Sequence, residues 1–233
     1  MEKKMKKLPI EKTKKHYKIR YINIISFLFV FGVFSYFLFQ IYQMPIKNIY
    51  IENNIYLKDQ EILELANLEN YPVSIKNSSN KIEERLLESP YIINVNVSKK
   101  NFSEIFIEVE ENKPLFYNYV SGKTVYENGY EDNKNYFLPT LINYVPDTLY
   151  QEFIEKMNLI NDDILTRISE IEYNPNEVDD KRFLLTMKEK NYVYLNLYKF
   201  ESINSYLELL KRFPDSKGIW YLDSGEFFKV YEK

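Results

Sequence analysis

From Tyr21 to Ile46 the chain runs for 26 residues without a charged side chain. The middle of this stretch reads Ile24-Ile25-Ser26-Phe27-Leu28-Phe29-Val30-Phe31-Gly32-Val33-Phe34. A helix rises about 1.5 Å per residue, so about 20 residues cross the roughly 30 Å hydrocarbon core of a bilayer. The length and composition of this stretch therefore favour a transmembrane helix, expected over residues 21–43, rather than a buried helix of a soluble protein.

The charges on either side of this stretch are distributed unevenly. Residues 1–20 carry nine Lys or Arg and two Glu, whereas the rest of the chain carries 22 basic and 32 acidic residues. A short basic flank stays in the cytoplasm under the positive-inside rule, so we expect a cytoplasmic tail and an extracytoplasmic C-terminal region. Attraction of the tail to anionic lipid is a second role that stays open. The acidic outer region would repel phosphates, which argues against nucleic-acid binding.

A cleaved signal peptide is the main alternative to a membrane anchor. The apolar region of a signal peptide usually runs about 7–15 residues and ends at a small-x-small cleavage site. Here the apolar stretch is longer and ends Gln40-Ile41-Tyr42-Gln43-Met44-Pro45, without a pair of small residues. We therefore expect an uncleaved anchor in a single-pass protein of the cell membrane.

The chain has no cysteine, and its single histidine, His16, lies in the basic tail. Neither disulfides nor thiolate chemistry is available, so the outer region depends on a hydrophobic core. The 187 residues after Ile46 suffice for one or two domains. Because general-base and metal chemistry most often use histidine, the composition predicts a protein that is not an enzyme and has no cofactor.

The residues after the anchor alternate between strand and helix patterns. Isoleucines within 46–51 predict a strand that ends at Glu52, and apolar residues at helical spacing predict a helix over 57–68. A second helix is expected to begin at Asn80, with Glu83 completing a capping box, and to stop before Pro90. Two strands with one buried face follow, joined by a loop over 99–103; their predicted inward residues are Ile93, Val95 and Val97, then Ile105, Ile107 and Val109.

This β-α-α-β-β order resembles a POTRA module. The resemblance rests on Ile49-x-Ile51-x-Asn53-Asn54-x-x-Leu57-x-x-x-Glu61-Ile62, on Ile82-Glu83-x-x-Leu86-x-x-x-Pro90-Tyr91-Ile92, and on Ile105-x-Ile107-x-Val109-x-Glu111-x-x-Pro114. A POTRA module directly after one N-terminal span is similar to the FtsQ/DivIB family of bacterial cell-division proteins. The resemblance implies a POTRA-like domain over 44–112 and a C-terminal β domain over 113–233. It also implies that the POTRA-like part serves recruitment to the division machinery.

The sequence pattern of the second half predicts a mixed α/β domain with a mainly antiparallel sheet, so the predicted fold class is α+β. The patterns predict a hairpin over 117–126, a helix over 147–157, a strand over 168–173, a hairpin over 183–197 and a helix over 202–211. The ending from Gly218 to Tyr231 resembles the last strands of the same family. Whether this half packs against the first or moves freely stays open.

Acidic and hydroxyl residues do not form a recognisable catalytic or metal site. Glu108 and Glu110 are expected on the solvated face of one strand, beside Glu111. The pairs Asp162-Asp163 and Asp179-Asp180 lack ligand clusters at metal spacing. Ser121-Gly122 and Ser224-Gly225 lack a nucleophile-elbow context and a histidine partner. We therefore predict neither catalytic nor metal-binding residues.

The C-terminal strand is the predicted binding site. An edge strand accepts a partner strand through backbone hydrogen bonds, while alternate side chains supply specificity. The resemblance implies contacts with a bitopic coiled-coil protein at Tyr221, Leu222, Asp223, Ser224, Gly225, Phe227 and Phe228. The competing interpretation is that Trp220, Leu222, Phe227 and Phe228 mainly belong to the hydrophobic core. Because side chains alternate between the two faces of a strand, about half of them must be buried.

The resulting hypothesis is a non-enzymatic scaffold of the divisome at the division septum. The resemblance implies FtsL-like and DivIC/FtsB-like bitopic coiled-coil proteins as partners, and no small-molecule substrate. Two alternatives stay open: a membrane-anchored cell-wall enzyme that uses carboxylates, and a POTRA-type chaperone for secretion.

Overall fold

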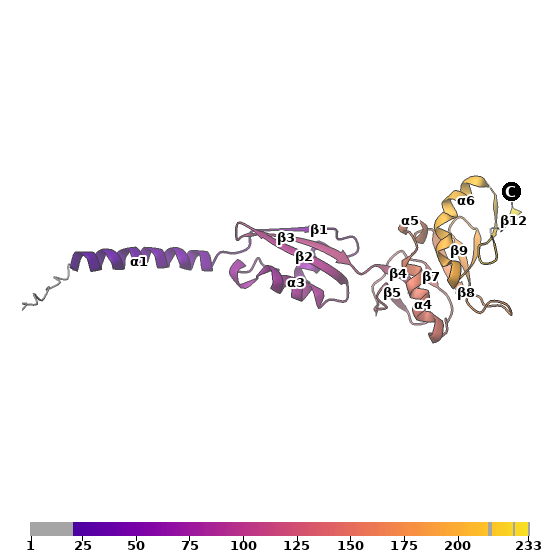
Figure 1. Ribbon diagram of the computed structural model, residues 1–233, viewed down its shortest axis with the longest axis horizontal. Coiled ribbons are helices and arrows are strands. Elements are labelled where there is room, and N and C mark those ends of the chain that lie inside the picture. Colours follow the sequence, from indigo (N-terminus) through magenta and orange to yellow (C-terminus); the bar gives the residue numbers. More distant parts are fainter. Residues whose placement is uncertain (1–20, 214–215, 226, 233) are drawn as a thin grey trace, which may run out of the picture.

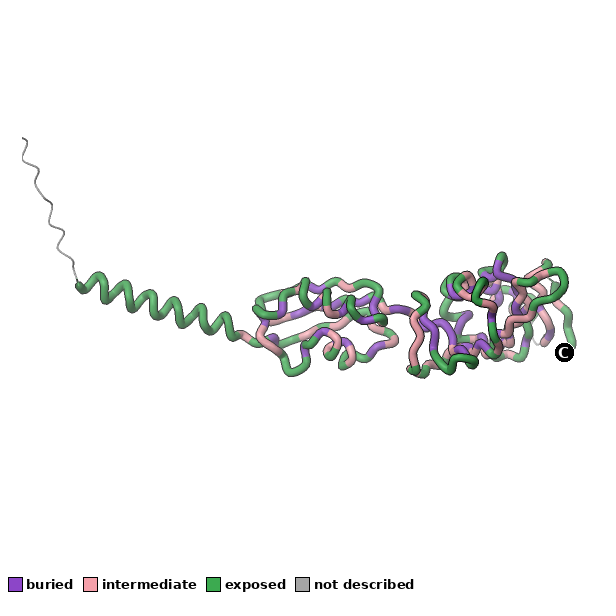
Figure 2. Tube along the Cα trace, turned by 90° about the horizontal axis from the view of Figure 1, so that it is seen from below, coloured by how far each residue is buried: buried purple, intermediate pink, exposed green. Residues whose placement is uncertain are grey.

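The chain forms three parts arranged in a line: a helix, a small α/β module and a larger C-terminal domain (Figure 1). This computed structural model describes residues 21–213, 216–225 and 227–232, so the predicted cytoplasmic tail lies outside the described residues. Helix α1 (Tyr21–Tyr42) is 22 residues long, and none of them is buried. Figure 2 shows α1 exposed along its whole length, apart from both folded parts. Its length and apolarity are sufficient to cross a membrane, and the predicted N-terminal apolar helix is confirmed.

The module next to α1 is a three-stranded sheet with two helices packed on one face. Its elements are β1 (Asn48–Glu52), α2 (Asp59–Leu65), the 3-10 turn η1 (Ser74–Lys76), α3 (Ser79–Leu87), β2 (Ile92–Lys100) and β3 (Glu104–Glu111). The strand order is β1-β3-β2, with β1 parallel and β2 antiparallel to β3. The predicted β-α-α-β-β order is therefore confirmed.

Two local predictions in this module are wrong. Ile93 is 45% exposed, because an irregularity in the β2–β3 pairing between Ile92 and Asn94 turns Ile92 inward instead. The helix α3 begins one residue before Asn80 and has Ser78 at its N-cap. The Glu83 carboxylate does not complete a capping box but accepts a hydrogen bond from the Val97 backbone N–H at 2.8 Å, which ties α3 to β2.

The C-terminal domain is built on a mixed nine-stranded sheet. Its strands are β4 (Pro114–Asn118), β5 (Lys123–Tyr126), β6 (Glu131–Asp132), β7 (Thr140–Leu141), β8 (Ile168–Tyr173), β9 (Arg182–Met187), β10 (Tyr192–Asn196), β11 (Lys217–Tyr221) and β12 (Phe227–Glu232). Their spatial order is β12-β11-β10-β9-β8-β7-β4-β5-β6. The β10–β11, β7–β8 and β4–β7 pairs are parallel, and the other pairs are antiparallel. The predicted mainly antiparallel α+β fold is confirmed.

The helices of this domain pack on one face of the sheet, where the main core lies. They are α4 (Asp147–Asn158), α5 (Asp162–Leu165), the 3-10 segment η2 (Leu197–Ser205) and α6 (Tyr206–Arg212). Phe153 of α4 stacks on Phe183 of β9 with ring centroids 4.8 Å apart, and Phe200 of η2 meets both rings edge-on. The helix predicted over 202–211 is two segments, because the chain is 3-10 helical up to Ser205 and α-helical only from Tyr206.

Candidate interaction surfaces

Strand β12 forms one edge of the nine-stranded sheet. It pairs with β11 on one side and, within the described residues, has no neighbouring strand on the other. In Figure 1 this edge lies at the end of the molecule farthest from α1. An unpaired edge presents a row of backbone donors and acceptors, which makes it a template for adding another strand.

The sheet face that the helices leave uncovered carries a row of aromatic side chains running inward from this edge. The pairing register places Phe227 beside Tyr221, Tyr221 beside Tyr194 and Tyr194 beside Leu184. The Tyr194 and Tyr221 rings stack with centroids 5.3 Å apart, and the Phe227 side chain is 64% exposed. Aromatic groups of this kind, half-exposed and rigid, are typical of binding surfaces.

A largely buried ion pair supports this aromatic row at the end of β11. The Arg182 Nε–H donates to Asp223 Oδ2 at 2.7 Å, and the two side chains are 12% and 9% exposed. The same guanidinium lies over the Tyr194 ring at 3.6 Å from the centroid. Burial raises the pKa of Asp223, but hydrogen bonds from Arg182 and from the Ser224 backbone outweigh it and hold the pKa below its usual value. Asp223 is therefore ionised, and it fixes both Arg182 and the turn that leads into β12.

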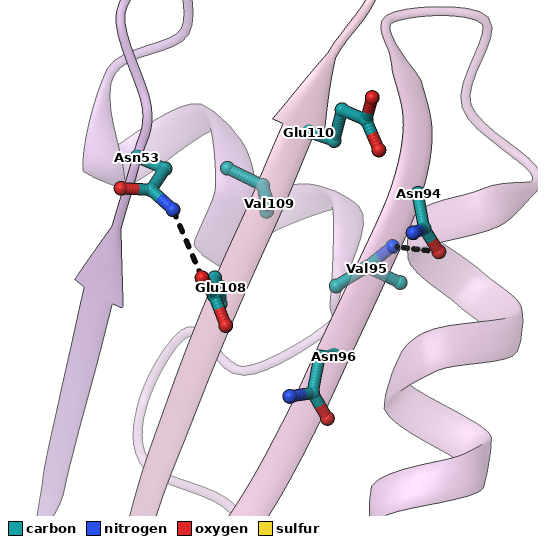
Figure 3. Close-up of a pocket in the computed structure, with 7 residues that line it drawn as sticks. All are labelled: Asn53, Asn94, Val95, Asn96, Glu108, Val109 and Glu110. Carbon is teal, nitrogen blue, oxygen red and sulfur yellow. Dashed lines mark hydrogen bonds between the residues drawn. The ribbon is translucent and has the colours of Figure 1, made fainter.

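The uncovered face of the smaller sheet has a different chemistry. Figure 3 shows Asn94 and Asn96 of β2 side by side with Glu108 and Glu110 of β3 along a shallow cavity of about 480 Å³. Asn53 donates to Glu108 at 3.1 Å from the end of β1. Glu108 and Glu110 are both exposed on one strand face, which confirms their prediction as a solvated surface.

Glu111 behaves differently from its two neighbours. Its carboxylate accepts hydrogen bonds from three consecutive backbone N–H groups, at residues 55–57, at 2.7, 2.7 and 2.8 Å. These bonds fix the loop between β1 and α2 to the last residue of β3. Glu111 therefore organises the end of the small module that faces the C-terminal domain, a role that its place in an acidic run did not indicate.

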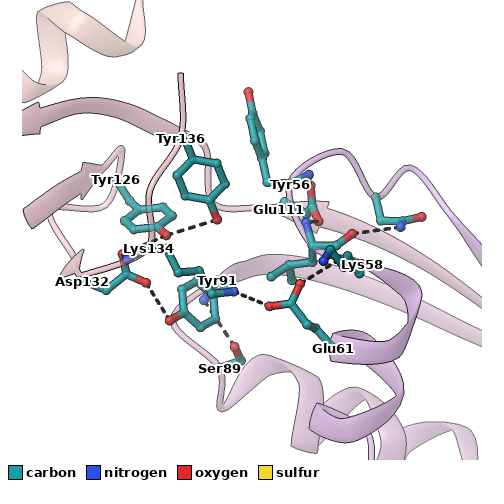
Figure 4. Close-up of polar contacts among 12 residues, drawn as sticks. Tyr56, Lys58, Glu61, Ser89, Tyr91, Glu111, Tyr126, Asp132, Lys134 and Tyr136 are labelled. Atoms are coloured by element: carbon teal, nitrogen blue, oxygen red, sulfur yellow. Dashed lines mark hydrogen bonds and ion pairs between the residues drawn. The ribbon is translucent and has the colours of Figure 1, made fainter. Parts of the chain in front are cut away.

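A network of charged and tyrosine side chains joins the two folded parts (Figure 4). The Lys134 ammonium donates to Glu61 of α2 at 2.6 Å and lies over the Tyr91 ring at 4.2 Å from the centroid. The Tyr91 hydroxyl donates to Asp132 at 2.8 Å, and the Tyr126 hydroxyl donates to the same carboxylate at 3.2 Å. Burial raises the pKa values of Tyr91 and Tyr126, so both hydroxyls stay protonated and act as donors. The second half therefore packs against the first in this structure.

The other acidic pairs are engaged in structural contacts. Asp162, in the first turn of α5, forms an ion pair with Lys113. Asp179 accepts hydrogen bonds from the Lys181 backbone and from Asn196 at 2.9 and 2.8 Å. Within the described ranges, His, Cys, Asp and Glu side chains form no group of three or more that could hold a metal ion.

Comparison with known proteins agrees with this architecture. Residues 44–112 match the model of the FtsQ-type POTRA domain. The chain is 24% identical to cell division protein DivIB of Listeria monocytogenes, over 95% of this chain and 86% of that protein. It is 27% identical to DivIB of Bacillus anthracis, over 94% of this chain and 86% of that protein. Over nearly its whole length the chain has homologues among the DivIB cell division proteins of the FtsQ/DivIB family.

A solved structure of the major extracytoplasmic domain of the trans isomer of DivIB from Geobacillus stearothermophilus also matches. It covers 45% of this chain and 90% of the solved chain, with 18% identity and a TM-score of 0.33. The single apolar helix, together with a DivIB-type extracytoplasmic region, fits a single-pass membrane protein.

The structure places the predicted contact residues of this chain in different environments. Leu222 is 3% exposed and belongs to the main core, and its backbone N–H donates to the Tyr194 carbonyl at 2.9 Å, so it is not open to a partner. Phe228 is partly buried and stacks on Trp220 with centroids 4.1 Å apart. Ser224 is exposed in the β11–β12 turn, where its backbone and hydroxyl both donate to Asp223. The side chains of Tyr221 and Phe227 lie on the uncovered face beside the edge.

Sequence reasoning missed part of the same surface. Tyr194 and Leu184 were predicted as strand residues, without a role, and Arg182 was not singled out. The alternation of Tyr192 and Tyr194 with buried Val193 and Leu195 is the signal that could have identified an aromatic outer face. Arg182 lies 41 residues from Asp223 along the chain, and only the strand order β9-β10-β11 brings them together.

Proposed function

We propose that this DivIB-family protein is a non-enzymatic scaffold of the bacterial divisome, anchored in the cell membrane at the division septum. Its partners are FtsL-like and DivIC/FtsB-like bitopic coiled-coil proteins, and it needs neither a catalytic residue nor a cofactor. The N-terminus lies in the cytoplasm, and residues 44–112 and 113–233 form two extracytoplasmic domains. Family membership supports the place of action, and the positive-inside rule supports the orientation.

The observation that carries the proposal is the free edge of β12 beside an aromatic face. A partner strand added at β12 gains backbone hydrogen bonds along the edge, and its side chains meet Phe227 and Tyr221 on the uncovered face. The turn residues Ser224 and Gly225 lie at the start of that edge. Leu222, Asp223 and Phe228 hold the edge in position from within the domain. The proposed contacts therefore divide into exposed residues that bind and buried residues that support.

Deleting residues 227–233 tests the edge directly. A larger deletion from Ile219 would also remove Trp220 and Leu222 from the core. The shorter deletion still removes Phe228, which stacks on Trp220, so urea unfolding followed by Trp220 fluorescence is measured on the deleted chain to check that the domain folds. The full chain in nanodiscs should capture a DivIC/FtsB-like partner in a pull-down, and the chain without 227–233 should not. Capture at full affinity by the deleted chain would overturn the assignment of the binding edge.

A single substitution tests the aromatic face with a matched control. Phe227 is 64% exposed beside the edge, and Phe137 is 99% exposed elsewhere in the same domain. Truncating a buried aromatic contact at an interface costs about 1–3 kcal/mol, so Phe227→Ala should weaken partner binding by about tenfold or more. Phe137→Ala should leave the dissociation constant unchanged. Equal effects from the two variants would argue against this face.

The cellular part of the proposal has its own measurement. A fluorescent fusion of the full chain should gather at midcell in dividing cells, and the same fusion should remain in the membrane when β12 is deleted. A uniform envelope signal from the full chain would contradict a role at the septum.

A further inference from the structure

A small cavity opens in the C-terminal domain, away from β12, where three parallel strands end. Strands β4, β7 and β8 run parallel, and the chain beyond β7 turns into the start of α4 at this place. The cavity has a volume of about 240 Å³ and is lined by Asn118, Val120, Ser121, Glu131, Asn143, Tyr144, Val145, Asp147 and Tyr150. Crevices outside the carboxyl ends of parallel strands are the usual binding places of α/β sheets. Its volume lies below the roughly 300–1,000 Å³ of sites for drug-sized ligands and suits a single side chain.

The walls of this cavity are apolar, and its rim is exposed. Val145 is 2% exposed at the inner end, whereas Val120 and Tyr144 are each 59% exposed at the mouth. Exposed apolar side chains gathered around a hollow, rather than scattered singly, are typical of a surface that contacts another molecule. The walls can therefore receive an apolar stem.

Hydrogen bonds hold the polar end of the cavity in one arrangement. The Tyr150 hydroxyl accepts a hydrogen bond from Asn118 Nδ2 at 3.1 Å and donates to Glu131 Oε1 at 3.2 Å. Asn118 Oδ1 accepts from the backbone N–H groups of Val120 and Ser121 at 3.0 and 3.3 Å. Burial and the nearby Glu131 carboxylate raise the pKa of Tyr150 to about 12, so its hydroxyl remains a donor at neutral pH. A site whose groups are fixed before binding loses little entropy when a ligand arrives.

The charges at the cavity favour a cation. Both charged side chains that line it within the described residues, Glu131 and Asp147, are acidic. The Tyr144 hydroxyl donates to Asp147 at 2.8 Å, which fixes this second carboxylate near the mouth. The N-terminus of α4 contributes the equivalent of about half a positive charge, which two full negative charges outweigh. Each carboxylate has about four lone-pair sites and keeps acceptor capacity beyond its bond to tyrosine.

We propose that this cavity binds a lysine or arginine side chain of a partner polypeptide. The apolar walls pack along the methylene stem, and Glu131 and Asp147 accept hydrogen bonds from the cationic head. Long basic side chains combine an apolar stem with a charged end in this way. The site is separate from the β12 edge, so it is a second contact point on the same domain and does not depend on the function proposed above.

The test uses the full chain in nanodiscs with ¹³C-labelled valine methyl groups. The probes are Nα-acetyl-lysine methylamide, Nα-acetyl-arginine methylamide, the uncharged Nα-acetyl-norleucine methylamide and n-butylamine. The lysine or arginine probe should shift the Val120 and Val145 methyl signals saturably. The norleucine probe, which has the stem but no charge, should bind at least about tenfold more weakly because it lacks the charge-assisted hydrogen bonds. The butylamine probe should also bind more weakly than capped lysine if the ligand belongs to a polypeptide.

Matched variants separate the site from non-specific attraction. Glu131→Gln and Asp147→Asn should each weaken binding of the basic probes about tenfold. Glu155→Gln removes a charge from the same helix outside the cavity and should leave binding within about twofold. Val120→Phe narrows the mouth at an exposed position, so it should abolish the shift of the remaining Val145 methyl signals without unfolding the domain.

Three outcomes would overturn the proposal. Equal affinity for the lysine and norleucine probes would show a merely apolar hollow. Equal affinity for butylamine and capped lysine would show a site for free amines instead of a polypeptide. Unchanged binding in the Glu131→Gln, Asp147→Asn double variant would exclude the carboxylates as the recognition groups.

Discussion

The two sheets of this protein each leave one face uncovered, and the two faces differ in chemistry. On the uncovered face of the small sheet, Asn94, Asn96, Glu108 and Glu110 line the cavity, and one aromatic pair, Tyr50 and Phe106, stacks beside them with ring centroids 4.7 Å apart. In the large sheet the uncovered row near β12 is aromatic and is backed by a largely buried ion pair. Polar faces of antiparallel sheets are often simply solvated, whereas exposed aromatic groups indicate contacts. The aromatic row and the ion pair behind it support the proposal that the large sheet makes the direct contacts with a partner.

The positions of the two sheets along the molecule support the same division. The small module follows α1 directly, and the β12 edge lies at the far end from it (Figure 1). A partner of the kind proposed, which spans the membrane once, would have to extend past the small module to reach β12. The position of the β12 edge relative to α1 depends on the small module and on the contacts of Lys134 with Glu61 and Tyr91, which join the two folded parts.

The largest expected contrast between the two sheets concerns their carboxylates. Asp223→Ala leaves the Arg182 guanidinium largely buried without its partner, which costs about 3–5 kcal/mol. Glu108→Ala removes an exposed carboxylate with one bond to Asn53, and should cost at most about 1 kcal/mol. Urea unfolding followed by Trp220 fluorescence reports the large sheet, because this is the only tryptophan. Segment-resolved hydrogen exchange reports the small one, and similar losses in both would remove the distinction.

The second contrast tests the irregularity in β2. Ile92 is 5% exposed, so Ile92→Ala should cost about 2–5 kcal/mol in the small module. Ile93→Ala truncates a side chain that is 45% exposed and should cost less than about 1 kcal/mol. Hydrogen exchange of the β2 and β3 amides measures both. A larger loss from Ile93→Ala would mean that simple alternation was right and the observed register wrong.

This pair of isoleucines also shows where sequence reasoning about the fold succeeds and fails. The apolar period identified the strands and most helices, because local sequence determines which side chains can share a face. The Ile92–Asn94 irregularity shifts that period by one residue, and nothing in the run Ile92-Ile93-Asn94-Val95 marks it. The strand pairings, such as β10 beside β11 across η2 and α6, depend on contacts far apart in the chain, so periodicity does not predict them.

The same limit applies to the candidate site. The edge position was predicted from a family resemblance, and the aromatic alternation of β10 was visible in the sequence. Strand alternation predicts that one of Phe227 and Phe228 is exposed and the other is partly buried. It does not predict which one faces inward, because that depends on the contacts of Phe228 with Trp220 and Phe213. The cavity that we propose binds a lysine or arginine side chain combines Asn118, Glu131 and Tyr150 from three elements. No spacing in the sequence connects these residues.

A smaller effect is expected at the junction between the two sheets. Lys134→Met removes the ion pair with Glu61, whose side chains are 31% and 35% exposed, so stability should fall by at most about 1 kcal/mol. The angular spread between the two parts should nevertheless widen, because this contact joins them directly. Since the chain has no cysteine, spin labels at introduced Leu87→Cys and Val178→Cys give the distance distribution. Lys156→Met, which loses a pair with Glu201 inside the large domain, should leave that distribution unchanged.

The smallest expected difference is in how the two regions respond to acid. Hydrogen bonds from Lys134 and the Lys58 backbone lower the pKa of Glu61, and the pKa of Asp223 is lowered despite its burial. A carboxyl whose pKa is lower in the folded state stabilises that state above its unfolded pKa, about 4, and loses this contribution as pH falls through the folded value. Both regions should therefore lose stability as pH falls below about 4.

Salt should weaken the contribution of the partly exposed Glu61 to stability, whereas the contribution of Asp223, which is 9% exposed, should persist. Unfolding measured across this pH range at low and high salt, with Glu61→Gln and Asp223→Asn, separates the two. A salt-sensitive Asp223 contribution would mean that its pair with Arg182 is open to solvent, and the aromatic row would then lack its buried support.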